Sequence, residues 1–425
     1  MFTTEDNELL TRSGQGTPMG ELLRRYWIPM MMCSELAEPD GPPVRMPLLG
    51  ERLLAFRDSE GRVGLIDEFC AHRRVSLYFG RNEQGGLRCT YHGWKYDVDG
   101  RCTEVPSEAG TGFCERIKLK AYPCIERGGV IWTYMGPLEL KPEPPAFEWC
   151  DLPASHVYLS RRWQESNFLQ AVEGGIDSNH VSWLHSGELD TDPLHRNTDG
   201  AKFARSRNTR FEIMESPGGL TIGVRRDAQP GQGYWRVTQF LMPWYTMIPP
   251  YSGNALNGHA WVPMDDGNCM AWTITFHPTR PLTSEELEAM ANGQGVHADL
   301  IPGSTRPRAN RDNDYLIDRE LQKSGRYYNG VKGLAIQDAS LQESMGAVVD
   351  RSRENLVSTD NAIIYARRRL LRAARNLAKL EHVPGTWRDD LYVRSSSFLL
   401  SDDKDFKPVI TESIVVRPGE PFVAV

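Results

Sequence analysis

Two short motifs in the first quarter of the chain each pair a cysteine with a histidine: Cys70-x-His72 and Cys89-x2-His92. In a Rieske 2Fe-2S cluster, two thiolates hold one iron and two imidazoles hold the other, so one Cys–His pair from each of two loops completes the ligand set. A structural zinc site is the alternative, but zinc motifs usually keep the two cysteines together and the two histidines together. The alternating order of these four residues therefore predicts a Rieske cluster.

A second set of metal-ligating residue types follows in the segment Asp177-x2-His180-x4-His185. Two imidazoles and a carboxylate form the facial triad of non-haem Fe(II), which leaves coordination positions open for O2. If the segment is helical, Asp177 and His180 share one face, but His180 and His185 lie about 140° apart around an ideal helix. Both histidines therefore reach one iron only if the helix widens, as at a π-bulge, or ends between them.

The carboxylate ligand of this second site must come from further along the chain. Asp338, in the segment GLAIQDASLQESMG, is one candidate at the start of an expected helix. Spacing alone does not separate it from Glu343, Asp350 or Glu354.

The elements that position these residues divide into an all-β part and a mixed part. Short β-rich runs separated by the turn sequences DSEG, EQGG and DVDG predict a small all-β module around the cluster. We expect an N-terminal helical segment over 1–26, with a helix beginning near Thr17 and Pro18, an all-β 2Fe-2S domain over 27–150 and a catalytic domain over 151–425. A proline-rich stretch over 136–153 resembles a linker.

The catalytic domain is predicted to be α+β, because its strand-like runs and helical patterns do not alternate regularly. The predicted elements are a helix over about 165–185, strands over 210–215, 219–225, 234–240, 258–263 and 270–277, helices within 311–381, and a last strand in DLYVRSSSFLL.

Composition narrows the class of protein. The chain has 425 residues, which favours two domains, and a net charge of -7, which argues against nucleic acid as a partner. No run of apolar residues is long enough for a membrane span, and the acidic start MFTTEDNELL is unlike a signal peptide, so we expect a cytoplasmic protein. Thiols stay reduced there, and the six cysteines outside the motifs are expected to pack in cores: Cys33, Cys102, Cys114, Cys124, Cys150 and Cys269.

Arginines along the strand-like runs indicate an acidic substrate, because Arg is the natural bidentate partner of a carboxylate. The candidates are Arg205, Arg207, Arg210, Arg225, Arg226 and Arg236. Arg236 is preferred, with Arg207 next, because aromatic neighbours predict a semi-buried strand at Arg236. Trp244 is a candidate for an apolar wall with Tyr245 and Met247, although core packing explains all three equally well.

Four stretches of the chain resemble the phthalate 4,5-dioxygenase-like group of Rieske non-haem iron oxygenases. They are LTRSGQGTPMGELLRRYWIP, the cluster loops with HGWKYDVDGRC, EGGIDSNHVSWLH, and NDYLIDRE with IQDASLQESMGAVVDRSRENL. The resemblance implies a terminal oxygenase that uses O2 on a small aromatic acid, by ring dihydroxylation or by O-demethylation. It also implies a β-sandwich-like Rieske domain, a helix-grip catalytic domain with mononuclear Fe(II), and a head-to-tail homotrimer.

The resemblance assigns roles to individual residues. It makes His180, His185 and Asp338 the iron ligands, and it makes Asp177 a bridge to His92 of a neighbouring subunit. It places Asn167 near the iron, although a helix-surface amide fits that position equally well.

Electrons are expected to come from NADH through a separate flavin and iron–sulfur reductase, because the chain has no G-x-G-x-x-G fingerprint after a strand. Two other classes of protein compete with this prediction. They are a Rieske electron-transfer protein without oxygenase chemistry and a zinc-stabilised binding protein.

Overall fold

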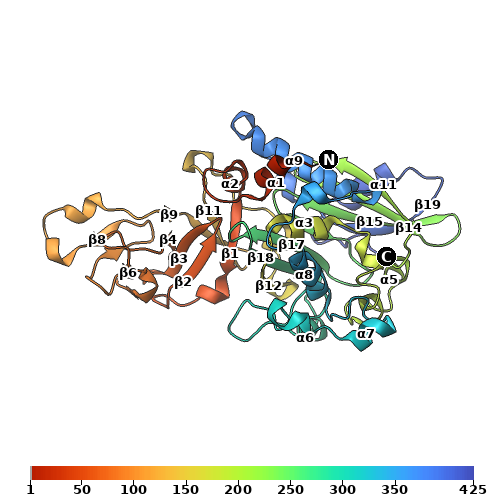
Figure 1. Cartoon of the computed structure of the whole chain (residues 1–425), viewed down its shortest axis with the longest axis horizontal. Coiled ribbons are helices and arrows are strands. Elements are labelled where there is room, and N and C mark those ends of the chain that lie inside the picture. Colours follow the sequence, from red (N-terminus) through yellow and green to blue (C-terminus); the bar gives the residue numbers. More distant parts are fainter. Residues whose placement is uncertain (1) are drawn as a thin grey trace. The chain divides into compact units, whose positions relative to one another are not determined.

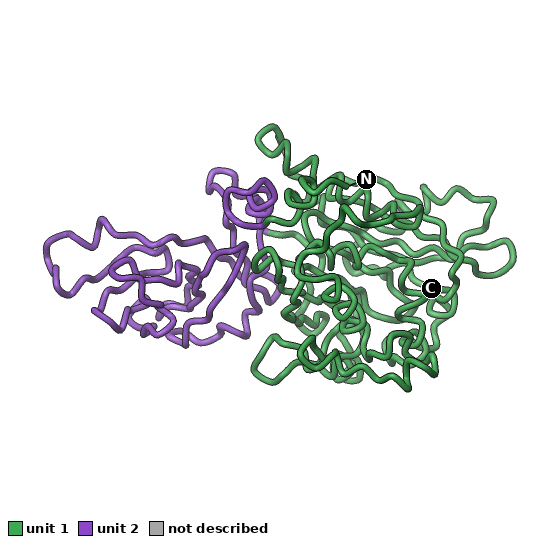
Figure 2. Tube along the Cα trace, in the orientation of Figure 1, with its two compact units in different colours: residues 1–12, 145–425 green, residues 13–144 purple. Residues whose placement is uncertain are grey.

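The structure, a computed structural model, describes residues 2–425 and forms two compact units. The smaller unit is Ser13–Pro144, and the larger joins the chain up to Arg12 with Pro145–Val425 (Figure 2). These bounds differ from the predicted boundaries after residues 26 and 150.

The expected N-terminal helical segment is divided between the units. Helix α1 (Thr4–Thr11) packs against α3 (Phe168–Ile176) and α9 (Asn361–Arg375) of the larger unit. Helix α2 (Pro18–Leu23) begins where predicted, with the Thr17 hydroxyl capping its first turn. The segment after α2 stays with the smaller unit, because the buried Arg24 side chain pairs with Glu51 at 2.9 Å.

The smaller unit consists of three antiparallel sheets, which agrees with the predicted all-β domain. The first sheet has the order β1 (Trp27–Met32), β11 (Val130–Tyr134) and β10 (Cys124–Arg127). The second has the order β2 (Val44–Leu48), β3 (Glu51–Arg57), β4 (Val63–Asp67) and β9 (Ala121–Tyr122). The third has the order β5 (Arg81–Glu83), β6 (Gly86–Arg88), β7 (Lys95–Tyr96) and β8 (Cys102–Glu104).

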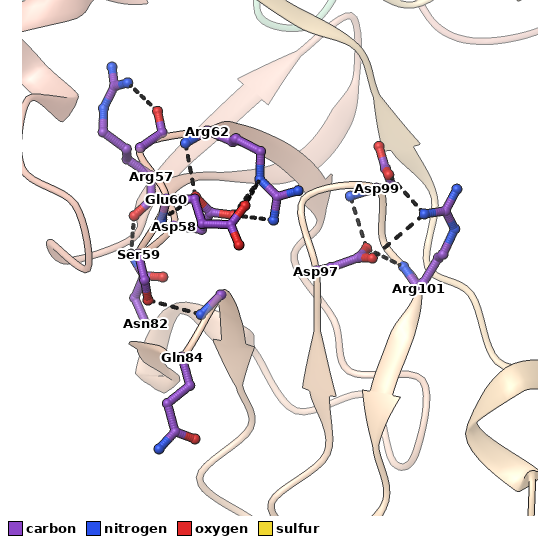
Figure 3. Close-up of polar contacts among 12 residues, drawn as sticks. Arg57, Asp58, Ser59, Glu60, Arg62, Asn82, Gln84, Asp97, Asp99 and Arg101 are labelled. Carbon is purple, nitrogen blue, oxygen red and sulfur yellow. Dashed lines mark hydrogen bonds and ion pairs between the residues drawn. The ribbon is translucent and has the colours of Figure 1, made fainter.

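Two of the predicted turn sequences, DSEGR and DVDGR, fold alike (Figure 3). The Asp58 carboxylate accepts hydrogen bonds from the backbone N–H groups of Glu60 and Arg62 at 3.0 and 2.9 Å. The Asp97 carboxylate accepts the equivalent bonds at 3.0 and 2.8 Å, two and four residues further along the chain. Each turn thus satisfies its own backbone through one aspartate, so it can connect neighbouring strands around the cluster.

The larger unit is built on an eight-stranded antiparallel sheet (Figure 1). Its order is β12 (Val157–Gln164), β18 (Cys269–Phe276), β17 (Leu256–Pro263), β16 (Tyr245–Ile248), β15 (Gln232–Leu241), β14 (Gly219–Asp227) and β13 (Thr209–Glu215), and β19 (Ser396–Ser401) also pairs with β15. The remaining α-helices are α4 (Glu188–Thr191), α5 (Asp199–Phe203), α6 (Ser284–Ala291), α7 (Arg319–Ser324), α8 (Leu334–Ser344), α10 (Arg388–Leu391) and α11 (Phe406–Ser413).

Helix α3 packs against β15, β16 and β17, while α9 packs against β13 and β14, so helices lie on the sheet as the α+β prediction requires. The five predicted strands and the last strand are present, but β12 and β16 were not anticipated. The helix expected over 165–185 is shorter, because it ends at Ile176. Among the described residues, no helix is long and apolar enough to cross a membrane.

Candidate metal centres and substrate cavity

The two Cys–His motifs lie in loops with the same hydrogen-bond pattern. The Cys70 N–H donates to the Val75 carbonyl at 2.9 Å, and the Cys89 N–H donates to the Trp94 carbonyl at 2.8 Å. The residue four places after each cysteine donates back to the cysteine carbonyl, at 2.9 Å in both loops. That residue is Arg74 in one loop and Gly93 in the other, and both have positive φ, 59° and 78°. The two loops therefore have matching backbone turns.

Burial separates the thiols from the imidazoles in this site. Cys70 and Cys89 are buried, whereas His72 and His92 are exposed and their ring centroids lie 4.5 Å apart. Trp94 stacks on His72 at 4.7 Å between centroids, and the Tyr96 hydroxyl lies 3.2 Å from the Cys70 sulfur. A Rieske cluster requires one thiolate-held iron and one imidazole-held iron, so buried sulfurs and outward-facing imidazoles fit it.

Three of the expected ligands of the second site converge in the larger unit. The Nε2 atoms of His180 and His185 lie 3.1 Å apart. The Oδ1 atom of Asp338 lies 3.5 Å from the first and 3.1 Å from the second. Ligand atoms about 2.1 Å from one ion and roughly at right angles lie about 3 Å apart, so the three atoms fit a facial triad on a single metal.

The local backbone explains how two histidines five residues apart meet. Helix α3 ends at Ile176, Asp177 is extended, and His180–Ser182 form one turn of 3₁₀ helix. The expectation that Asp177 and His180 share a helix face is therefore incorrect, and no π-bulge is needed. The Asp177 carboxylate instead reaches back to Nδ1 of His180 at 3.5 Å.

Asp338 comes from the first half of α8, and the other carboxylates that spacing allowed lie elsewhere. Glu343 accepts from the Tyr315 hydroxyl at 2.6 Å, Glu354 pairs with Arg367, and Asp350 caps a 3₁₀ helix. Tertiary structure thus singles out Asp338 from the four candidates.

Gln337 fixes the orientation of His185, and sequence reasoning did not find it. The Gln337 amide donates through Nε2 to the Val331 carbonyl at 2.9 Å, which leaves its Oε1 to accept from Nδ1 of His185 at 2.7 Å. His185 therefore carries its hydrogen on Nδ1 and presents the Nε2 lone pair to the metal position. The buried Glu188 accepts from the same amide at 3.4 Å and from the Gly333 N–H at 2.7 Å. Gln337 directly precedes the candidate ligand Asp338 in the sequence, and this position was the only sign that it could support the site.

The pKa values of His180 and Asp338 follow from their surroundings. Burial alone would lower the pKa of His180, but Asp177 and Asp338 outweigh it and raise that pKa to about 9. Burial alone would raise the pKa of Asp338, but the two histidines outweigh it and lower that pKa to about 2. The aspartate is thus ionised at neutral pH, as a metal ligand must be.

A cavity that is partly open to solvent lies beside the triad. Its lining includes all three triad side chains and the apolar side chains of Val181, Leu189, Ile248, Pro249, Trp261 and Val296. Its polar lining includes Arg236, His195 and Asn254. A mostly apolar wall with a few polar groups is typical of a site for a small organic molecule.

Arg236 is the most unusual of the cavity residues. Its side chain is 3% exposed, and no carboxylate among the described residues pairs with it. Its guanidinium donates to the Pro249 carbonyl at 3.2 Å and lies 4.4 Å from the Tyr251 ring centroid, while its Nε has no partner. A buried cation without a counterion is costly, and an anion bound beside it would offset that cost.

Three other predicted residues do not line the cavity. Asn167 is fully buried and caps α3, because its Oδ1 accepts from the Leu169 N–H and its Nδ2 donates to the Thr11 carbonyl. Arg207 is exposed and stacks on Trp183 at 3.4 Å. Trp244 is fully buried in the core of the larger unit. The structure therefore does not bring Asn167, Arg207 or Trp244 to the cavity lining beside the triad.

Comparisons with known proteins agree with this arrangement. The model of the Rieske [2Fe-2S] domain matches residues 26–123, and the model described as LigXa C-terminal domain like matches residues 133–403. The chain belongs to the Rieske oxygenases. The oxygenase is 39% identical to the phthalate 4,5-dioxygenase oxygenase subunit of Pseudomonas putida, over 96% of this chain and 94% of the relative.

Two further relatives are similar over most of their length. The oxygenase is 36% identical to the 3-chlorobenzoate-3,4-dioxygenase oxygenase subunit of Comamonas testosteroni, over 97% of this chain and 99% of the relative. It is 30% identical to the 5,5'-dehydrodivanillate O-demethylase oxygenase subunit of Sphingobium sp., over 92% and 84%. All three relatives are oxygenase subunits, which confirms the predicted group and the enzyme class and disfavours the electron-transfer alternative.

Solved structures support the fold of the oxygenase. Dicamba monooxygenase bound to dicamba superposes with a TM-score of 0.59 at 17% identity, over 84% of this chain and 99% of that one. The Pseudomonas putida CBB5 NdmA QL mutant with caffeine gives 0.59 at 19% identity, over 91% and 99%. The predicted combination of an all-β Rieske domain and an α+β catalytic domain is confirmed.

Proposed function

We propose that this terminal oxygenase acts on a small aromatic carboxylate, with O2 as oxidant and with NADH electrons delivered by a separate flavin and iron–sulfur reductase. The observation that carries the substrate class is the buried Arg236, which no carboxylate of the described residues pairs with, on the same cavity as His180, His185 and Asp338. A cation on a mostly apolar wall is complementary to a ring that bears a carboxylate.

In this proposal the chain holds two iron centres. Cys70, Cys89, His72 and His92 hold the 2Fe-2S cluster, and His180, His185 and Asp338 hold a mononuclear Fe(II). When bound, the cluster stores electrons and the mononuclear iron activates O2. Gln337 keeps the Nε2 lone pair of His185 directed at the metal position.

The side chains around the cavity set the pose of the substrate. The Arg236 guanidinium, whose residue lines the cavity, binds the substrate carboxylate, and the apolar wall that includes Ile248 and Trp261 encloses the ring. Since Arg236 is buried, an ion pair with it is stronger than it would be at the surface. A fixed carboxylate determines which ring position or substituent lies next to the triad.

We further propose a cytoplasmic, head-to-tail homotrimer in which Asp177 accepts a hydrogen bond from His92 of a neighbouring copy. The Asp177 carboxylate is only partly buried, and it already contacts His180 at 3.5 Å. One carboxylate that accepts from two imidazoles would orient both rings.

Turnover with a surrogate reductase tests the proposed function. We expect the purified protein to hold one iron in addition to the pair in its cluster, and to consume O2 with at least one member of a panel of benzoates. Release of formaldehyde from a methoxybenzoate identifies O-demethylation, whereas a cis-diol identifies ring dihydroxylation. Iron restricted to the cluster, or O2 uptake that no aromatic acid stimulates, contradicts the proposal.

A further inference from the structure

One end of the cavity brings a cation and an imidazole to the same aromatic ring. The guanidinium carbon of Arg236 lies 4.4 Å from the centroid of the Tyr251 ring, and the His195 ring centroid lies 5.4 Å from it. All three side chains line the cavity that contains the triad. A ligand whose anionic group binds Arg236 therefore also comes close to His195.

The hydrogen-bond pattern fixes the tautomer of His195. Its Nδ1 lies 2.9 Å from the carbonyl oxygen of Leu194, and because a carbonyl only accepts, the hydrogen sits on Nδ1. Burial lowers the pKa of His195, and Arg236 and His185 lower it further against the opposing effect of Asp192. The ring is therefore neutral, and its Nε2 carries a lone pair that accepts hydrogen bonds.

Within the described part of the chain, nothing donates to this Nε2. The only hydrogen bond of the His195 side chain is the one from Nδ1, although the residue is just 6% exposed. The backbone that carries the ring is also held in place, since the His195 N–H donates to the Asp192 carbonyl and the Thr198 hydroxyl donates to the His195 carbonyl, both at 3.1 Å. His195 is thus a rigid, unused acceptor on the cavity wall.

Asn254 is a further polar residue of the cavity lining. Its amide Nδ2 is buried and has no acceptor, and the residue lines the cavity together with His195. The Nε of Arg236 likewise has no acceptor. Buried polar groups normally find partners, so the unpaired Nε2 of His195 on the cavity wall points to a ligand that donates a hydrogen bond there.

We propose that His195 selects aromatic acids that carry a hydroxyl or amino substituent, by accepting a hydrogen bond from that substituent at Nε2. In this arrangement Arg236 and Asn254 bind the carboxylate of the same molecule. The proposal rests on the proposed function, since it presumes an aromatic acid in this cavity, and it adds a second group that the site recognises.

The expected selectivity arises because an acid without a donor substituent leaves Nε2 of His195 without a hydrogen bond. A methyl or fluoro group in place of the hydroxyl cannot donate, so Nε2 of His195 would lose its water without gaining a partner. Such a loss weakens binding about tenfold to a hundredfold. A methoxy group cannot donate either, so the site would also discriminate against the O-methylated acid.

Binding calorimetry on the intact, iron-loaded protein without reductant tests this inference. The ligands are the three hydroxybenzoate isomers, the three aminobenzoates, and their methyl, fluoro and methoxy counterparts. The variants are His195→Leu, which removes the acceptor, His195→Gln, whose amide oxygen restores one, and Ile248→Val, which alters the same wall without a polar group.

We expect at least one hydroxy or amino isomer to bind about tenfold or more tightly than its methyl and fluoro counterparts. His195→Leu should remove that preference, while His195→Gln and Ile248→Val should keep part or all of it. Equal binding of donor and non-donor acids by the native protein, or a preference that survives His195→Leu, overturns the inference and leaves the aromatic-acid function standing. Absence of binding by every acid overturns both.

Discussion

Replacing Gln337 with leucine removes the group that fixes the tautomer and direction of His185. In the native structure the amide oxygen accepts from Nδ1 of His185 at 2.7 Å, and the amide nitrogen donates to the Val331 carbonyl at 2.9 Å. Leucine fills a similar volume but offers neither group. His185 can then rotate or change tautomer, and both changes withdraw Nε2 from the metal position.

The expected loss of Fe(II) affinity can be derived from the usual contribution of a hydrogen bond that supports a metal-ligating histidine. Loss of the partner behind a metal-ligating histidine typically weakens metal binding 10- to 100-fold, equivalent to about 1.4–2.7 kcal/mol. The buried Val331 carbonyl and the Nδ1–H of His185 also lose partners, so we expect a stability loss of about 1–3 kcal/mol for each group that stays unpaired. Gln337→Leu should therefore weaken Fe(II) binding more than a general loss of stability explains.

Gln342→Leu is the matched control, because Gln342 is also a buried glutamine on α8 but makes its side-chain hydrogen bond with Gln164, away from His185. Its Oε1 accepts from Gln164 at 2.7 Å, and it has no contact with His185. The assay is anaerobic titration of the mononuclear site with Fe(II), with the cluster left intact, alongside urea unfolding of both variants. The reasoning is refuted if Gln337→Leu binds Fe(II) within twofold of the native protein, or if Gln342→Leu weakens binding equally.

Three further outcomes can be checked. Arg236→Met should weaken the binding of aromatic acids about 10- to 100-fold. Its melting temperature should stay equal or rise, because the change removes a buried cation that has no carboxylate partner. Arg207→Met, at an exposed position, is the control, and equal affinity of the two variants for the acids contradicts the role of Arg236. Asp177→Asn should retain both kinds of iron but slow product formation in a single turnover after reduction of the cluster, so an unchanged rate argues against the intersubunit bridge. Burial alone would raise the pKa of Glu173, but Arg351 and Arg367 outweigh it and hold that pKa below its usual range. The ionised carboxylate therefore stabilises the fold above the unfolded pKa of about 4.3, and this stabilisation is lost as the pH falls through the folded pKa. Glu173→Gln should reduce the slope of the unfolding free energy against pH in the acid range, and an unchanged slope would exclude Glu173 as a main contributor.

Much of the cluster site could be predicted from sequence because its ligands are local. Each Cys–His pair lies within one short loop, so residue type and spacing alone define the donor set of Cys70, His72, Cys89 and His92. The turns that flank these loops were also visible, since Asp58 and Asp97 each satisfy their own turn without help from distant residues. Local hydrogen bonding is the reason that local sequence was sufficient.

The second site required the tertiary structure, because its parts come from distant segments. His180 and His185 lie in an irregular segment after α3, and spacing could not show how the backbone turns between them. Spacing left four carboxylates open, and only the packing of α8 brings Asp338 to 3.1 Å from His185. The predicted helix over 165–185 was too long, because α3 ends at Ile176 and the two histidines meet only in the irregular segment that follows.

The substrate end shows the same division between what sequence determines and what folding decides. Residue type showed that arginines lie along the strands, and aromatic neighbours favoured Arg236. Strand pairing decided which arginine faces the cavity: Arg236 lies opposite Val224 and Ser397 in the middle of the sheet, whereas Arg207 precedes β13 and remains exposed. The sequence by itself determined the donor types and the two-domain plan, because these depend on short-range spacing. Only the tertiary structure decided which polar groups are buried together without partners, because burial depends on contacts between segments far apart in the chain.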